Sequence, residues 1–315
     1  MLPRYKIALR IPNDRGKYFS FRLHEHLANE PTDYIQPKKL VVIAGINGNF
    51  QTFCNLLIKS EVLDTSLGWI FQDNHLVILG DYTAHNAHPV ESLWFIYSLE
   101  NKARKAGGYV HLILGDHELT CLNGDWCYDH PRYAKLHDRS YERAVLFDGN
   151  GEIKRWLLTK NIVEKIGNSL FTHVELTHHV VQAGLSLSQI NSLARHKYSS
   201  MGKITDLPFI TMWSDKEKVQ CTSEKSNNGI SEELLTDNLL AHFNVHTIVT
   251  GGGNTRRVNS RYNDKIVDVC ADHVDNRSEA LFVKYDRFYR FTLEGRLVRI
   301  KQTGVWNGKQ VIRQE

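Results

Sequence analysis

The chain of 315 residues is 42% hydrophobic and 23% charged, which excludes a disordered, collagen-like or coiled-coil protein. Its 39 Lys and Arg residues against 35 Asp and Glu residues give a net charge of +4, and no stretch gathers the excess into the basic face that nucleic-acid binding needs. Apolar runs are far shorter than the roughly 20 residues of a membrane helix, and no apolar signal-peptide core follows the first residue. We therefore expect a cytoplasmic protein with no nucleic-acid partner and no membrane span.

Three apolar runs in the first half of the chain predict buried parallel strands. They lie at 39–45, 75–79 and 109–114, and each ends at a glycine or directly before one. Helical patterns fill the gaps between them, at 50–59 and at 91–108, where basic residues and a glycine pair are typical of a helix end. This alternation of strands and helices predicts a parallel α/β sheet.

The second half is richer in strand patterns. Strands are predicted at 161–166, 169–173, 245–250, 266–270 and 280–284, with a hairpin through 291–297. We therefore predict a four-layer αββα sandwich, in which two mixed sheets are flanked by helices. No linker divides the chain, so we expect a single domain over 1–315, with an irregular extension at 1–38 and a polar, mobile loop at 215–231.

Polar loops follow the three predicted parallel strands, at 45–49, 80–86 and 115–118. Ligands of open parallel sheets collect at the carboxyl ends of the strands, so Asp81, Asp116 and His117 are candidate site residues. The two aspartates have an alternative interpretation as helix caps or turn residues, and the histidine as an ordinary packed side chain.

The segment from Ala106 to Tyr128, with its Gly-Asp-His-Glu run and the later Gly-Asp pair, resembles the metallophosphoesterases. Within them it is similar to the phosphoprotein phosphatase group of calcineurin-like enzymes, and to its Shewanella-like branch. Weaker likenesses follow in the same order at 171–173, 212–215 and 251–255. The resemblance covers about residues 40–281 and implies the metallophosphoesterase fold and a site for two metals.

The resemblance also assigns roles to residues of this chain. It places the metal-bridging aspartate at Asp81, an asparagine ligand at Asp116 and a later histidine ligand at His173. The general acid of the family corresponds to His117. Two carboxylates and one imidazole offset the charge of at most one divalent ion.

Other family positions are degenerate in this chain. Gly45 and Asn47 replace two of the three protein ligands of the first metal. The second motif carries Ala84 and His85 where the family has aspartate and arginine. At the position of the family's last histidine ligand, this chain has a glycine or Asn254 instead. The arginines that grip phosphate are missing, which leaves the phosphate-binding residues unknown and removes charge-assisted contacts.

These losses favour a pseudophosphatase that holds no cofactor and acts by binding a protein partner, in phosphorylated form or not. The alternative is a mononuclear phosphoesterase with one divalent metal, Mn, Fe or Zn, and with His117 as the acid. A third interpretation is a binding scaffold that uses the aromatic residues near Trp126, Tyr128 and Tyr133.

Overall fold

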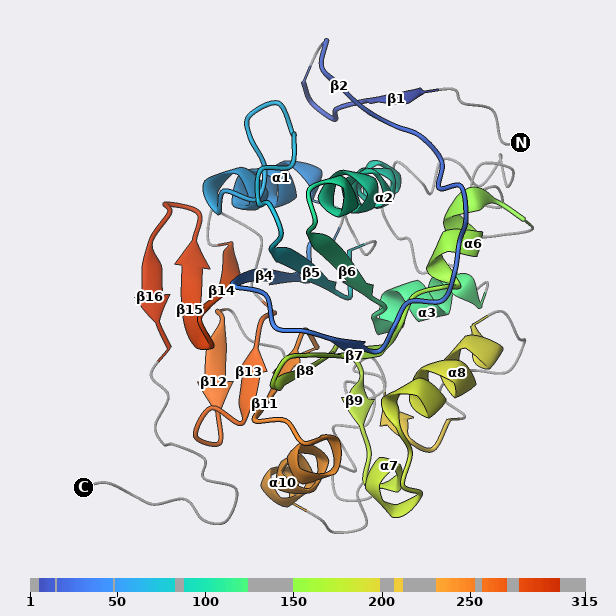
Figure 1. The fold of residues 1–315 in the computed structure, drawn as a ribbon, viewed down its shortest axis with the longest axis vertical. Helices are drawn as coiled ribbons and strands as arrows, with labels where there is room; N and C mark the ends of the chain where they lie inside the picture. Colours follow the sequence, from blue (N-terminus) through green and yellow to red (C-terminus); the bar gives the residue numbers. More distant parts are fainter. Residues whose placement is uncertain are drawn as a thin grey trace.

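The structure is a computed structural model that describes residues 6–14, 16–47, 49–82, 88–123, 150–198, 207–211, 231–252, 257–270 and 278–300. Its centre consists of two six-stranded sheets that pack face to face (Figure 1). Most of the polar loop predicted at 215–231 lies outside the described residues. Among the helices that are described, none has both the length and the apolar character to cross a bilayer.

The first sheet has the strand order β16-β15-β14-β4-β5-β6. Its parallel half contains the three strands predicted from apolar runs, namely β4 (Lys39–Ala44), β5 (His75–Leu79) and β6 (Tyr109–Ile113). Its antiparallel half contains β14 (Glu279–Lys284), β15 (Arg287–Thr292) and β16 (Leu297–Arg299). Because β4 to β6 are parallel and adjacent, their carboxyl ends meet at one edge of the sheet.

The second sheet has the order β12-β13-β11-β8-β7-β3 and is also mixed. Its strands are β3 (Asp33–Tyr34), β7 (Val163–Ile166), β8 (Ser169–Thr172), β11 (Thr247–Thr250), β12 (Asn259–Arg261) and β13 (Ile266–Asp268). A small separate ribbon pairs β9 (Glu175–Leu176) with β10 (Ile210–Thr211). The strands predicted in the second half of the chain are therefore confirmed, with ends that differ by one or two residues.

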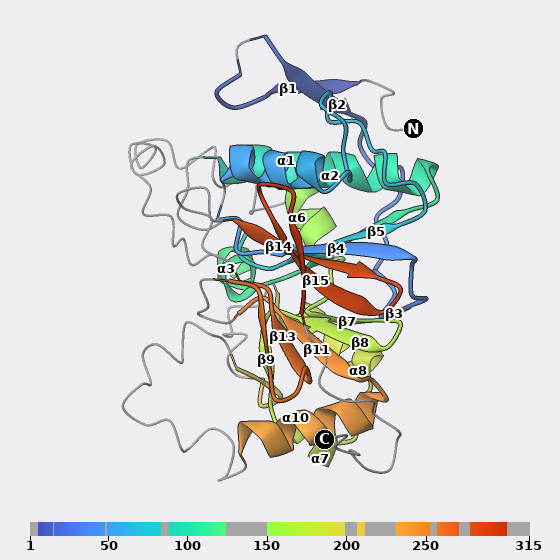
Figure 2. The same ribbon diagram turned by 90° about the vertical axis from the view of Figure 1, so that its left-hand side faces the viewer.

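Helices form the two outer layers (Figures 1 and 2). The first sheet is covered by α1 (Phe50–Lys59) and α2 (Pro89–Lys105), and the second by α7 (His179–Gln182), α8 (Leu187–Lys197) and α10 (Glu232–Phe243). Two shorter helices, α3 (Asp116–Leu122) and α6 (Glu152–Leu157), lie near β6. This arrangement confirms the predicted αββα sandwich.

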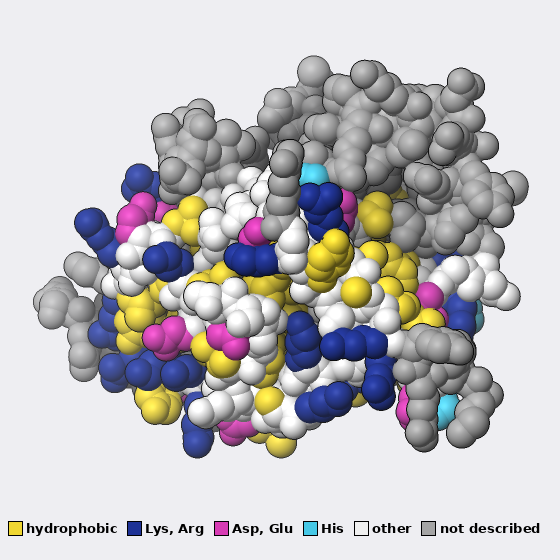
Figure 3. Space-filling view, turned by 90° about the horizontal axis from the view of Figure 1, so that it is seen from above, with side chains coloured by type: hydrophobic (Ala, Val, Ile, Leu, Met, Phe, Trp, Pro, Cys, Tyr) yellow, Lys and Arg dark blue, Asp and Glu magenta, His cyan; other side chains and the backbone are white. Residues whose placement is uncertain are grey.

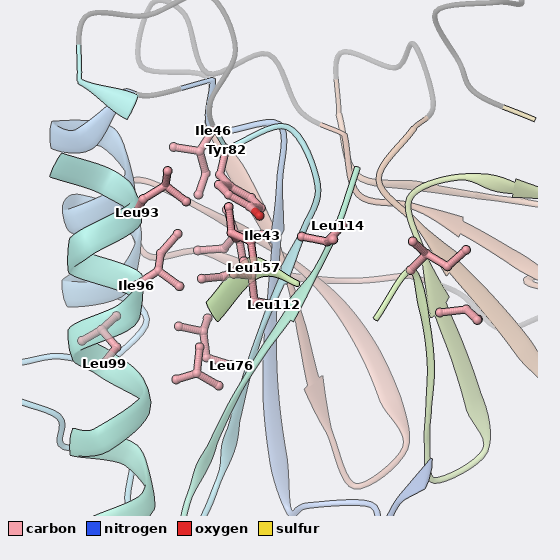
Figure 4. Close-up of a cluster of buried hydrophobic side chains, with 14 of the residues drawn as sticks. Ile43, Ile46, Leu76, Tyr82, Leu93, Ile96, Leu99, Leu112, Leu114 and Leu157 are labelled. Atoms are coloured by element: carbon pink, nitrogen blue, oxygen red, sulfur yellow. The ribbon is translucent and has the colours of Figure 1, made fainter. Parts of the chain in front are cut away.

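Both faces of the central strands are buried, which explains their nearly continuous apolar sequences. In β4, Leu40 and Val42 face the second sheet, whereas Ile43 faces the helices. Figure 4 shows Ile43 beside Leu93 and Ile96 of α2. The alternation of side chains along each strand thus divides the apolar residues between two cores.

The expectation of an irregular extension at 1–38 is wrong for its described part, residues 6–14 and 16–38. β1 (Ile7–Arg10) and β2 (Tyr18–Phe21) form an antiparallel hairpin, and β3 joins the edge of the second sheet. The physical reason is the alternation along β2, which buries Phe19 and Phe21. Phe19 packs edge-on against Phe95 of α2, and Phe21 stacks on Trp94.

A buried ion cluster joins the segment before β3 to α2 and α6. Lys160 Nζ lies 2.6 Å from Glu30 Oε1 and 2.7 Å from Glu100 Oε1. The indole Nε1 of Trp156 donates to Glu100, and Lys160 lies over the Trp156 ring. Although burial alone would lower the pKa of Lys160, Glu100 and Glu30 raise it. We call these four residues, with His24 beside Glu100, the edge cluster.

Candidate metal centre

Three strand ends bring candidate ligands together. Asp81 follows β5, Asp116 begins α3 just after β6, and His173 follows β8 of the second sheet. Chain order separates these residues widely, but the ends of β5 and β6 are adjacent and β8 packs beneath them. The fold therefore places two carboxylates and one imidazole at the junction of the two sheets.

The three side chains form one compact group, which we call the ligand group. One ligand atom from each lies within 4.8 Å of the others. His173 Nε2 is 3.3 Å from Asp81 Oδ2 and 3.2 Å from Asp116 Oδ1. The His173 side chain is 1% exposed and that of Asp116 is 5% exposed, whereas Asp81 is 22% exposed and forms the open side of the group.

Two glycines allow this close approach. Gly80 has a φ of +62°, and a Cβ there would lie 2.3 Å from the His173 ring. A Cβ on Gly115 would lie 2.8 Å from the Cα of Gly80 and 2.9 Å from Asp81 Oδ1. Real Cβ atoms do not approach so closely, so both loops depend on glycine to hold Asp81 against His173.

Glu118 fixes the loops from behind. Its Oε2 accepts hydrogen bonds from the backbone amides of Asp81 and Gly115, at 2.9 and 3.0 Å, and its Oε1 accepts from the amide of Tyr82 at 3.1 Å. Its carboxylate is thus occupied by backbone donors and lies outside the ligand group. A buried carboxylate bound in this way positions the ligands.

The electrostatics of the group are governed by His173. Burial alone would lower the pKa of His173, but the charge of Asp81 and the hydrogen bond to Asp116 raise it well above the usual value. Its Nδ1 lies 3.3 Å from the carbonyl oxygen of Leu79. A proton on Nδ1 would therefore be held by that carbonyl, which directs Nε2 toward the two carboxylates.

The donor set suits one divalent ion. Within the described part of the chain, Asp81 Oδ1 is a buried oxygen without a hydrogen-bond partner. Two carboxylates and one imidazole are donors that Mn, Fe and Zn all accept. A bound ion would take the place of the proton that the two carboxylates otherwise stabilise on His173.

Among the described residues, the remaining candidate positions do not join the ligand group. Gly45 and Asn47 are brought beside the Asp81 loop, since the amide of Gly45 donates to the carbonyl of Gly80 and that of Asn47 to the carbonyl of Asp81. Both have positive φ values, +62° and +52°. His117 is partly exposed on the first turn of α3. Ala84, His85 and Asn254 lie outside the described residues.

Sequence reasoning missed Cys270. Its Sγ lies 3.5 Å from the point where a Cβ on Gly45 would sit, beside the position where a ligand side chain at residue 45 would begin. The contact arises because Ala44 and Cys270 form a parallel bridge at the ends of β4 and β13. The only sequence signal was that Cys270 follows an apolar strand, and this does not reveal which strand is its neighbour.

Sequence comparison places the chain near the Shewanella-like phosphatases. It is 26% identical over 160 residues to Shewanella-like protein phosphatase 1 of Plasmodium berghei, which covers 50% of this chain and 44% of that protein. It is also 26% identical over 97 residues to Shewanella-like protein phosphatase 2 of Arabidopsis thaliana, covering 31% of this chain and 25% of that protein. The chain thus spans less than half the length of these curated relatives.

Solved structures agree with this placement. The cold-active protein-tyrosine phosphatase of a psychrophilic Shewanella species superposes with a TM-score of 0.76 and 27% identity, over 93% of this chain and 90% of that one. A protein serine/threonine phosphatase from Saccharomyces cerevisiae shares the fold at a TM-score of 0.55 and 14% identity, over 81% of this chain and 76% of that one. The model of the calcineurin-like phosphoesterase family matches residues 38–268, and the chain therefore belongs to that family.

Proposed function

We propose that this protein is a pseudophosphatase, which uses the phosphatase fold to bind a protein partner, in phosphorylated form or not, without efficient hydrolysis. The observation that carries the proposal is the pair Gly45 and Asn47. Gly45 has no side chain to offer a metal, and Asn47 offers a neutral amide in place of an imidazole. A two-metal site stabilises both the attacking and the leaving oxygen of phosphoryl transfer, and one ion cannot do both.

The ligand group supports the presence of one divalent ion in this pseudophosphatase, rather than the expected absence of a cofactor. Asp81, Asp116 and His173 would hold the ion, and Glu118 would keep their loops in place. A bound ion supplies Lewis acidity and attracts phosphate oxygens. Binding of a phosphorylated side chain would then use the ion, while turnover would suffer from the missing second ion and arginines.

A second candidate function is a mononuclear phosphoesterase. The observation that favours it is the compact ligand group itself, with its buried and unpartnered Asp81 oxygen. His117 stands at the general-acid position of the family and is partly exposed beside Asp116, and in this candidate it would protonate the leaving oxygen. The two candidates differ in turnover and share the metal.

Two measurements on one preparation separate the candidates. Protein purified without chelator is subjected to elemental analysis, and hydrolysis of a chromogenic phosphate ester is measured with added Mn. A pseudophosphatase gives about one equivalent of metal or less and no turnover above a matched Asp81→Ala sample. Asp286→Ala, at an exposed turn, serves as the control for changing an aspartate elsewhere.

Turnover that Asp81→Ala abolishes and Asp286→Ala preserves would refute the pseudophosphatase and establish the phosphoesterase. Turnover that survives in Asp81→Ala would point to a contaminating enzyme. If Asp81→Ala binds as much metal as the wild type, the ion does not bind at the ligand group, and both candidates are wrong about the metal site.

A further inference from the structure

A second candidate binding surface lies at the other end of α2. A pocket of about 340 Å³ is enclosed by the β1–β2 hairpin and the last turns of α2. Among the described residues, no Asp or Glu side chain lines it. Its charged lining consists of four cations, Lys6, Arg22, Lys102 and Lys105, which with Ser20 and Ser98 we call the basic pocket.

Among the described residues, no carboxylate forms an ion pair with any of these four cations. Lys102 Nζ donates a hydrogen bond to the carbonyl oxygen of Leu67 at 3.0 Å, which does not neutralise its charge. Arg104, on the same helix, differs because its guanidinium lies 3.6 Å from Glu30. The helix therefore has one cation that is paired with a carboxylate and two that line the basic pocket.

Lys102 and Lys105 have a possible structural explanation, because basic side chains in the last turn of a helix interact favourably with its dipole. This explanation does not extend to Lys6 and Arg22, which belong to the hairpin. Burial lowers the pKa of Lys102, Asp64 and Cys54 partly offset that effect, and the charge of Lys6 lowers the pKa further. Like charges brought into one pocket repel each other, and an anion in the pocket would offset this repulsion.

We propose that the basic pocket docks an acidic segment of a partner polypeptide. The volume suits one or two anionic side chains, and the Ser20 and Ser98 hydroxyls add polar groups beside the cations. Figure 3 shows Lys and Arg side chains gathered on this face of the molecule. A nucleic acid would need a long basic track, whereas the basic pocket is compact.

This pocket would serve an active enzyme as well as an inactive one. The loop that carries Asp81 leads into the start of α2, whereas the basic pocket lies along its last turns, from Ser98 to Lys105. The two sites therefore lie toward opposite ends of a helix that is about 25 Å long. The basic pocket therefore adds a docking site to the proposed function and does not depend on the metal.

Binding of a fluorescent glutamate-rich peptide, measured by anisotropy at low salt, tests the proposal. The double reversal Arg22→Glu/Lys105→Glu is expected to weaken binding on the order of tenfold or more, and Arg22→Gln/Lys105→Gln by less. The control Lys284→Glu/Arg287→Glu changes the net charge equally at the exposed β14–β15 turn and is expected to stay within about twofold of wild type. Circular dichroism checks that each variant is folded.

Asp81→Asn is expected to bind the peptide like the wild type, since it alters the metal centre alone. The proposal is overturned if the wild type does not bind the peptide or if Asp81→Asn abolishes binding. It is also overturned if Arg22→Glu/Lys105→Glu and the control Lys284→Glu/Arg287→Glu weaken binding equally. Stronger binding of single-stranded RNA than of the peptide would also overturn it. A failure here leaves the metal and turnover results of the proposed function untouched, so the two can be told apart.

Discussion

Two of the clusters of buried charge in the described part of the protein are balanced differently. In the edge cluster, Lys160 lies between two carboxylates and supplies a permanent positive charge. In the ligand group, the described side chain that lies between Asp81 and Asp116 is that of His173. A lysine carries its positive charge permanently, whereas a histidine between two carboxylates can give up its proton to a bound cation. This difference favours the ligand group over the edge cluster as the candidate metal centre.

The largest effect is expected at the edge cluster. Lys160→Met removes the ammonium group that Glu30 and Glu100 share, and leaves Arg104 at 3.6 Å as the cation beside Glu30. The loss is expected to cost about 3–5 kcal/mol in the free energy of unfolding. Urea denaturation measures the loss, with Lys154→Met on the partly exposed side of α6 as the control. If Lys160→Met lowers the free energy of unfolding no more than Lys154→Met does, the edge cluster does not stabilise the fold.

Acid is expected to weaken the same cluster. Burial, followed by the charge of Lys160, lowers the pKa of His24 to about 4, so the unfolded chain takes up this proton first as the pH falls below about 6.5. The stability that neutral His24 contributes is therefore present above this value and is lost toward pH 4, by up to about 3 kcal/mol.

The unfolding free energy at pH 7 and pH 5 is compared for the wild type, His24→Gln and the exposed control His26→Gln. We expect His24→Gln to lose less stability between the two pH values than the other proteins. Part of the loss will remain, because the pKa values of His75 and His111 are also lowered, each to about 3. An unchanged pH dependence in His24→Gln would contradict this account.

The ligand group is expected to respond to metal and the edge cluster is not. Mn at one hundred times its dissociation constant should stabilise the wild type by about 2.7 kcal/mol, and Asp116→Asn should abolish this gain. Thermal unfolding with and without Mn measures it, and Asp286→Asn serves as the control. Equal Mn stabilisation of the wild type and Asp116→Asn would show that the ion binds elsewhere.

The smallest effect concerns the degenerate first-metal position. Gly45→Asp with Asn47→His restores two ligand types, and the aspartate must adopt the left-handed φ of Gly45 at a cost of about 1–2 kcal/mol. The Cys270 sulfur at 3.5 Å leaves ordinary contact space for the new Cβ. We expect elemental analysis to find more bound metal, and the phosphate ester assay to find no turnover. Recovered turnover would show that the missing arginines are dispensable.

The strands and the ligand residues were largely predictable from the sequence, because they depend on local signals. Buried parallel strands such as β5 are apolar throughout, and Asp81 follows a strand directly. Parallel topology then brings Asp81 and Asp116 to the same edge without further information. The family resemblance supplied His173, whose own surroundings carry no local signal.

Contacts between distant parts of the chain were not predictable. Glu30 and Lys160 are 130 residues apart, and no periodicity links them. The same holds for Cys270 and Gly45, which meet because β13 ends beside β4. The hairpin carried a short local signal at Tyr18–Phe21, but its partner surface on α2 is formed by tertiary packing.

The N-terminal segment has a practical consequence for the choice of expression boundaries. The family match begins at residue 38, yet the residues before it supply Phe19 and Phe21 to the helical layer, Glu30 to Lys160, and β3 to the second sheet. A protein shortened to begin at residue 38 would expose the aromatic surface of α2 and leave Lys160 with Glu100 but without Glu30. We therefore expect the cooperative folding unit to begin well before the family boundary.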